Sequence, residues 1–370
     1  MNFKESFKHS HAPFPFVLRD RYTKLRTCLI FFCSLFFVLI SGFCLHGNSE
    51  EKYSYSEVFT IGIDQPEKEK DKPYQFYQII SIDCDKEENI YILDYTAICA
   101  KKFDQDGTFL KRFFRKGKGP NEISNAFSIA INRQTDHIFI LQDYGFTFKE
   151  FDIEGNYVKR HVLPRQFFGK FSFLDKDKFI YMNSVPKKDE YNNFHIVNID
   201  QKQIIKEFSP IKMKHELNFK QYFDVKGNSI LWTSRGNEMT LLEFDLKTGL
   251  KVQEIRIPGK YKENKLLETG SGNMTLVIPI LYNVAQPFVI NDQLFTLVVL
   301  QEYREKNGKI DKFPTAWKRI IYQVNGSRFL KLGELEDSEG MYIGTVSKNR
   351  LILYSNEPYG RIRVLDFKKH

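Results

Sequence analysis

From residue 54 onward, short apolar segments alternate with turns rich in Asp, Asn, Lys and Gly. Apolar runs of about four to eight residues bounded by such turns predict β-strands. One unit of three segments, the last an aromatic residue followed by Asp and a Gly turn, occurs twice at a distance of 48 residues. Its two copies occupy 81–85, 89–94 and 102–107, then 128–132, 137–141 and 150–155.

The Asp of the third segment marks the period of the repeat, because it recurs as Asp104, Asp152, Asp200 and Asp245, at gaps of 48, 48 and 45 residues. Four strands of about five to six residues with their turns need this length, so the period predicts one four-stranded propeller blade per unit. Further copies occupy 292–298 with 321–326, and 349–354 with 364–366. We interpret the repeated Asp residues as Asx-turn residues that fix each hairpin.

Six units predict an all-β fold, a six-bladed β-propeller of four-stranded antiparallel blades over residues 54–370. The last unit ends after its third strand, at 364–366, so its outer strand has to come from elsewhere. The strand-like segment 56–63 is the candidate, since pairing it with the last unit closes the ring and removes an open sheet edge. The Lys-rich stretch 302–317 is predicted to be an excursion between two strands of the fifth blade.

The N-terminal segment has the pattern of an export signal. A basic cluster ending at Arg26 precedes 17 uncharged residues, 27–43, a length between that of a signal peptide and that of a spanning helix of about 20 residues. We therefore assign residues 1–44 to a signal peptide or membrane anchor and 45–53 to a linker. Ser41-Gly42-Phe43-Cys44 resembles a bacterial lipoprotein box, with Phe43 departing from it, so Cys44 is either acylated or simply apolar.

Charge and cysteine content narrow the partners. Residues 45–370 hold 49 Lys and Arg against 44 Asp and Glu, a net charge of +5 that argues against nucleic-acid binding. Cys84 and Cys99 are the two cysteines of the predicted propeller, and we favour free buried thiols over a disulfide.

The loop Arg115-Lys116-Gly117-Lys118-Gly119-Pro120-Asn121-Glu122 resembles the Gly-Lys-Gly-Pro-Gly-Glu loop of the NHL-like or TolB-like six-bladed propellers found as envelope lipoproteins in Gram-negative bacteria. Asn121 stands where that family usually has Gly. The similarity extends over residues 54–370 and implies an exported, membrane-anchored protein of the bacterial cell envelope. Members of this family mostly lack an assigned activity, so the resemblance implies the fold more than the function.

Two places are candidates for binding. The loop reads as a tight connection between blades, or as an anion site in which Arg115, Lys116 and Lys118 surround backbone amides. Asp94 and Asp143, at the ends of two second strands, are either turn residues or members of a polar site at one rim.

No catalytic motif stands out. The eight histidines form no ligand pair with metal-binding spacing, and 83–88 lacks the Gly and distal Glu of a calcium loop, so we expect neither metal nor other cofactor. The sequence therefore predicts a monomeric, non-enzymatic, envelope-tethered binding or scaffolding propeller for a protein, peptide or glycan. The alternative is a metal-dependent hydrolase, lactonase or lyase with its site on the propeller axis.

Overall fold

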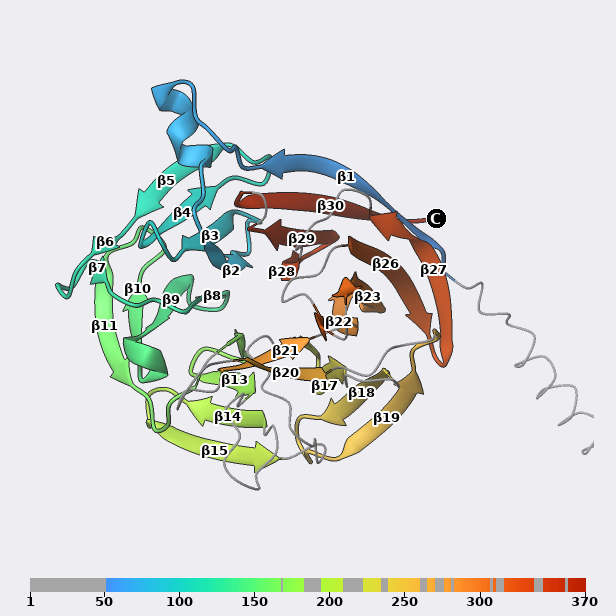
Figure 1. Ribbon diagram of the computed structural model, residues 1–370. Coiled ribbons are helices and arrows are strands. Elements are labelled where there is room, and N and C mark those ends of the chain that lie inside the picture. The colour runs from blue at the N-terminus through green and yellow to red at the C-terminus, as the bar shows by residue number, and fades with distance from the viewer. Residues whose placement is uncertain are drawn as a thin grey trace, which may run out of the picture. The chain divides into compact units, whose positions relative to one another are not determined.

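Six sheets of four antiparallel strands follow one another along the chain and surround a common centre (Figure 1). This confirms the predicted all-β, six-bladed propeller. The computed structural model describes residues 51–167, 169–182, 194–208, 222–233, 239–259, 265–269, 276–280, 283–306, 309–310, 316–335, 342–356 and 359–370. The segment 1–44, with its predicted signal or anchor and Cys44, lies outside these residues. In the described part of the chain, no helix is long and apolar enough to cross a membrane.

Blades 1 to 5 run from the innermost strand to the outermost strand in chain order, whereas the outermost strand of blade 6 is β1. Blade 1 consists of β2 (Ile79–Cys84), β3 (Ile90–Asp94), β4 (Cys99–Phe103) and β5 (Phe109–Phe113). Blade 2 consists of β8 (Ser128–Asn132), β9 (His137–Gln142), β10 (Thr147–Phe151) and β11 (Tyr157–Val162). Blade 3 consists of β12 (Phe171–Phe173), β13 (Lys178–Met182), β14 (Phe194–Asn198) and β15 (Gln203–Phe208).

Most strands of blades 5 and 6 are longer than those of blades 1 to 4. Blade 4 consists of β16 (Phe223–Lys226), β17 (Ser229–Thr233), β18 (Thr240–Asp245) and β19 (Lys251–Arg256). Blade 5 consists of β22 (Asn283–Ile290), β23 (Gln293–Glu302), β26 (Ala316–Asn325) and β27 (Arg328–Leu335). Blade 6 consists of β28 (Tyr342–Ser347), β29 (Arg350–Ser355), β30 (Arg361–Lys369) and β1 (Tyr53–Ile61).

Several strands inside the blades are buried along their whole length. Every residue of β3, β8 and β10 is buried, because each blade packs between two neighbours and both faces of its inner strands are covered. The outermost strands have one open side. In β15 exposed and half-buried residues alternate, and most residues of β19 are exposed.

The ring closes as the sequence predicts. β1 pairs antiparallel with β30 from Tyr53 opposite Lys369 to Ile61 opposite Ile362, with a register shift between Glu57 and Phe59. An ion pair between Glu57 and Arg363 joins the two strands. The outer strand of the last blade thus comes from the other end of the propeller, and β30 is left with no free edge.

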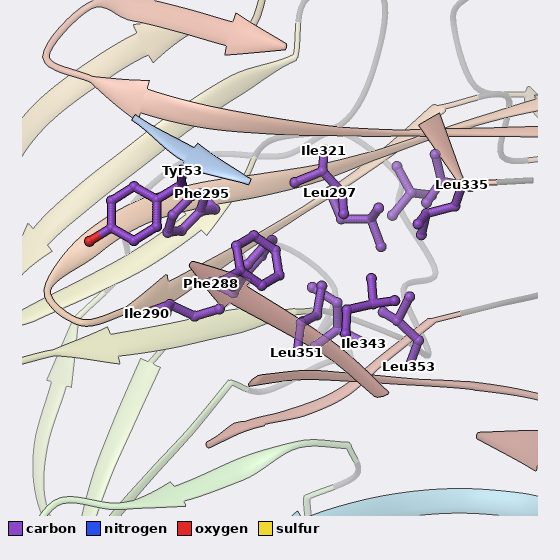
Figure 2. Packing of buried hydrophobic residues seen from close by; sticks show 14 residues of the cluster. Tyr53, Phe288, Ile290, Phe295, Leu297, Ile321, Leu335, Ile343, Leu351 and Leu353 are labelled. Carbon is purple, nitrogen blue, oxygen red and sulfur yellow. The ribbon is translucent and has the colours of Figure 1, made fainter. Parts of the chain in front are cut away.

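An aromatic and aliphatic cluster fills the space between blades 5 and 6 at this closure (Figure 2). Tyr53 of β1 lies edge-on to Phe295, with ring centroids 5.3 Å apart. Phe367 of β30 contacts both Phe288 and Phe295, at 5.8 and 5.1 Å between centroids. The closing strands are therefore held by side-chain packing as well as by backbone hydrogen bonds.

Side-chain carboxylates fix the turns between third and fourth strands, as predicted for Asp104, Asp152 and Asp245. Each accepts hydrogen bonds from backbone amides within four residues of itself. Asp200 differs: its carboxylate pairs with Lys159 at 3.1 Å, and the preceding Asn198 accepts the amide of Gln201 instead. The prediction is wrong at this one position because Asn198 already supplies the acceptor that the turn needs.

Three further features lie between or beside the blade strands. The predicted excursion in blade 5 lengthens β23 and β26 to ten residues each, and it carries the short pair β24 (Glu305–Lys306) and β25 (Lys309–Ile310). A hairpin of β20 (Lys265–Thr269) and β21 (Leu276–Ile280) follows blade 4, a position that the repeat does not predict. Two short 3-10 helices, η2 (Glu69–Tyr74) and η3 (Asp143–Gly145), complete the described elements, with the parallel pair β6 (Arg115–Lys116) and β7 (Glu122–Ile123).

Cys84 and Cys99 are both buried and free, as expected from the sequence. Burial raises the pKa of each thiol. They are therefore packed core residues and poor nucleophiles at neutral pH.

Replacing Phe367 with Ala is expected to lower the free energy of unfolding by about 3–5 kcal/mol, because it empties the centre of the closure cluster. Chemical unfolding of the purified protein measures this. The matched control is Leu250→Ala, whose side chain is 68% exposed, with an expected change within about 0.5 kcal/mol. A Phe367→Ala variant as stable as the control would show that the closure contributes little.

Candidate functional site

A cavity of about 710 Å³ occupies the centre of the ring. It is lined by the innermost strands β2, β8, β12, β16 and β28 and by residues that flank them. The side chains at its wall are mixed: Phe127, Phe171 and Phe173 are aromatic, while Arg133 and Lys170 are basic. Ligand pockets in proteins commonly have volumes of about 300–1,000 Å³, so the cavity is large enough for a small ligand or part of a larger one.

Two acidic residues of the wall are engaged by the protein itself. Asp83 of β2 accepts the amides of Cys84 and Ile131, each at 2.8 Å, and the hydroxyl of Thr345 at 3.0 Å. Asp224 of β16 accepts its own neighbour, the amide of Val225, at 2.9 Å and the amide of Val289 at 3.1 Å. Both carboxylates therefore tie one blade to another.

The same device recurs with neutral side chains. Ser81 accepts the amide of Ile129 at 3.1 Å, Gln286 accepts the amide of Ile343 at 3.0 Å, and Asn356 accepts the amide of Ile79 at 2.7 Å. In each case the amide belongs to the innermost strand of the next blade. Innermost strands of adjacent blades do not pair through their backbones, so these side chains satisfy amides that would otherwise be buried without an acceptor.

The basic residues of the wall differ in their surroundings. Arg133 follows β8 and donates from Nε to the carbonyl of Cys84 at 3.0 Å, with its guanidinium 3.6 Å from Asp83. Lys170 precedes β12, and within the described part of the chain its ammonium makes no hydrogen bond or ion pair. Lys170 is thus a positive charge at the cavity wall that is close enough to Asp224 to act on its carboxyl group, without a direct ion pair between them.

Asp224 has an unusual environment for a carboxylate. Part of its surface is open to the cavity, yet the surrounding protein withdraws water from the carboxyl group, and this burial raises its pKa above the ordinary value of 3.8. The charge of Lys170 and the two amide hydrogen bonds act in the opposite direction. Asp224, Arg133 and Lys170 were not singled out from the sequence, because only the ring brings their blades together.

The predicted rim residues Asp94 and Asp143 do not line the cavity. The carboxylate of Asp94 is fully buried and accepts the amides of Tyr77 at 2.9 Å, Gln78 at 3.2 Å and Ala97 at 3.1 Å. Asp143 accepts the hydroxyl of Thr147 at 2.7 Å and pairs with Arg160 at 3.0 Å. Both residues therefore make the contacts expected of turn residues. A ligand role for either carboxylate stays a prediction.

The loop 115–122 carries its own anion. Glu122 pairs with Arg115 at 2.9 Å and accepts the amide of Gly119 at 2.9 Å, and these contacts lower the pKa of its carboxyl group, led by the Gly119 amide. A Cβ added to Gly117 would meet the Glu122 carboxylate at 1.9 Å, so a larger residue there would require this side chain to move. An external anion would have to displace Glu122 to reach this amide. Anion binding by Lys116 and Lys118 stays a prediction.

The acidic segment 83–88 is a strand connection. Asp85 accepts the amides of Glu87 and Asn89 and the hydroxyl of Tyr91, so its lone pairs are directed at the protein. Among the residues that the structure describes, no group of three or more His, Cys, Asp or Glu side chains could hold a metal ion. The alternative of a metal-dependent enzyme therefore finds no ligand set in this part of the chain.

Replacing Asp224 with Asn tests its environment through the pH dependence of stability. A carboxyl group with a raised pKa holds more protons in the folded state than in the unfolded state, so its contribution to stability falls as pH rises from about 3.8 through the raised pKa. We expect the free energy of unfolding of the wild type, relative to Asp224→Asn, to decrease between about pH 4 and about pH 7.5. Chemical unfolding at both pH values measures the change.

The control is Asp152→Asn. The pKa of Asp152 lies below its ordinary value. Burial alone would raise this pKa, but hydrogen bonds from Asn156 and from backbone amides outweigh burial. The stability of the wild type relative to this variant should therefore rise with pH up to about pH 5 and stay constant above it, so no decrease towards pH 7.5 is expected, unlike at Asp224. The same sign at both positions would contradict the assignment for Asp224.

Comparisons with known proteins agree with the fold. The family DUF5128, described as a six-bladed β-propeller, matches residues 74–234, and no curated protein matches the chain. A predicted exported protein from Bacteroides fragilis is 11% identical over 88% of this chain and 96% of its own, with a TM-score of 0.56. A member of the DUF4221 family from Bacteroides vulgatus is 10% identical over 86% of this chain and 99% of its own, also with a TM-score of 0.56. At such low identity these likenesses support the six-bladed propeller and leave its ligand open.

Proposed function

We propose that this protein is an exported propeller, attached to the bacterial cell envelope by its N-terminal segment, that binds a ligand at the central cavity without catalysing a reaction. The observation that carries the proposal is how the charged side chains of the cavity wall are engaged. Asp83 and Asp224 are each held by backbone amides, while Lys170 lines the cavity without a hydrogen bond or direct ion pair to a described residue. Such a wall can recognise a group, but it offers no converging carboxylates for metal or acid-base chemistry.

Export is supported by the pattern of residues 1–44, in which a basic cluster precedes an uncharged apolar run. The similar protein from Bacteroides fragilis is also described as exported. The resemblance of loop 115–122 to envelope lipoproteins is in keeping with attachment through Cys44 or through a retained anchor.

The binding surface is expected to be the central cavity and the loops around its opening, since a rigid circular scaffold holds loops from six blades around one opening. The partner is then a protein, peptide or glycan of the envelope. The modest net charge of the propeller gives no reason to propose a nucleic acid.

Photo-crosslinking tests this proposal. The full chain carrying p-benzoylphenylalanine at Ser172, a residue of β12 in the cavity wall, is expected to give a reproducible crosslinked product when irradiated in the cells that make it. The control carries the same group at Leu250, which is exposed in the turn between β18 and β19. Products at Leu250 equal to those at Ser172, or none at Ser172, would contradict binding at the cavity.

Membrane attachment has its own test. If acylation of Cys44 holds the protein, Cys44→Ser should move it from the membrane fraction to the soluble fraction, because one retained apolar segment of 17 residues is short for a stable span. Cell fractionation with quantitative immunoblotting measures the distribution. A Cys44→Ser protein that stays in the membrane fraction would instead assign the attachment to an uncleaved anchor.

A further inference from the structure

Two exposed tyrosines occupy the same position in adjacent blades. Tyr95 follows β3 in blade 1, and Tyr144 follows β9 in blade 2, each directly after an Asp whose carboxylate is held by the turn. Their side chains are 39% and 62% exposed. The turns that seemed to offer carboxylates thus present aromatic rings instead.

The turn at Tyr144 holds a costly backbone conformation. Asp143 and Tyr144 both have positive φ, at 52° and 55°, a region that non-glycine residues seldom adopt and that costs on the order of 1–3 kcal/mol per residue. Gly145 is required next, because a Cβ there would lie 1.9 Å from the carbonyl oxygen of Phe167. The hydrogen bonds of Asp143 stabilise this turn, in which the Tyr144 side chain is exposed.

Phe127 connects the two tyrosines into one surface, which we call the aromatic strip (Tyr95, Phe127 and Tyr144). The ring centroids of Tyr95 and Phe127 are 6.5 Å apart, and those of Phe127 and Tyr144 are 6.1 Å apart. Phe127 directly precedes β8 and also lines the cavity. The strip therefore continues from the rim of blades 1 and 2 into the cavity mouth.

Lys170 lies at the same end of the cavity as the strip. It directly precedes β12 as Phe127 directly precedes β8, and the innermost strands of adjacent blades contact one another in equivalent positions around the ring. Contacts of β2 place Tyr95 at this end too, since the amide of Tyr95 donates to Gln78, the residue that precedes β2. An apolar surface and a positive charge thus share one mouth.

Two polar side chains beside the strip, those of Gln78 and Gln166, already form hydrogen bonds within the protein. Gln78 accepts the hydroxyl of Thr96 at 3.4 Å, and Gln166 donates to the carbonyl of Tyr144 at 2.6 Å. Recognition of a sugar requires polar groups that are open to its hydroxyls as well as an aromatic face. Ring contacts with apolar side chains are what this strip offers, and exposed aromatic surfaces of this kind are typical of protein interfaces.

We propose that the aromatic strip and Lys170 together bind an extended acidic peptide segment of a partner protein, with apolar side chains on the strip and a carboxylate at Lys170. This inference rests on the proposed binding function and assigns its ligand class. Tyrosine anchors of this type commonly dominate the affinity of an interface, while a charged contact at the rim adds selectivity.

The test is selection of a random twelve-residue peptide display library on the immobilised full chain. Enriched peptides are expected to combine aromatic or aliphatic residues with Asp or Glu. The affinity of a synthetic enriched peptide should weaken about tenfold or more with the double variant Tyr95→Ser and Tyr144→Asn, where Asn suits the positive φ. Leu250→Ser, at an exposed apolar residue in the turn between β18 and β19 of blade 4, is the matched control and should leave affinity unchanged.

The contact with Lys170 is tested by a double-mutant cycle. Lys170→Gln should weaken the acidic peptide, and should have little effect on the same peptide with its acidic residue changed to the amide. Additive effects of the two changes would contradict the carboxylate contact. Unchanged melting temperatures of all variants exclude loss of fold as the cause.

Other outcomes separate the two proposals. No enriched peptide, or Tyr-dependent binding to an arrayed glycan instead, would overturn the peptide assignment while crosslinking at Ser172 still supports binding at the cavity. Loss of both the enriched peptides and the Ser172 crosslink would overturn the proposed function as well.

Discussion

The propeller depends on how the amides of its innermost strands are satisfied. Backbone hydrogen bonds hold the four strands of a blade together, but among the described strands no backbone ladder crosses from one blade to the next. Side chains take that role: Asp83, Asp224 and Gln286 each accept an amide of the following blade. Each such bond joins two adjacent blades beside the central cavity, whose wall is partly polar and partly apolar. Removing an acceptor would leave a buried amide unpaired, at a cost of about 1–3 kcal/mol.

The sequence predicts the blades well because the information for a blade is local. Strand-length apolar runs, turn residues and the 48-residue period all lie within one unit, and even the closing strand could be predicted from the unit that lacks its fourth strand. The hairpin β20–β21 was missed because it falls between two copies of the repeat. The cavity could not be predicted, since Lys170 and Asp224 become neighbours only when separate blades meet around the axis.

Asp94 and Asp143 show a second limit of sequence reasoning. The sequence does not show whether the carboxylate of an Asp at a strand end faces solvent or a group of the protein. Here both carboxylates accept hydrogen bonds from the protein. The two turns share their next residue, since an exposed tyrosine, Tyr95 or Tyr144, directly follows each Asp. The functional surface can therefore lie one residue away from the most conspicuous polar side chain.

The pairing of β1 with β30 makes the two ends of the propeller interdependent in time. Ser54 contacts His370 across a separation of 316 residues, and closing so long a loop costs about 5 kcal/mol of chain entropy. Contacts this distant in sequence form late, after the intervening blades have stacked. The first strand to be synthesised is thus among the last to find its partner, and a chain truncated before residue 361 would keep an unpaired strand at each end. Ring closure therefore makes the order of β1 depend on the presence of β30.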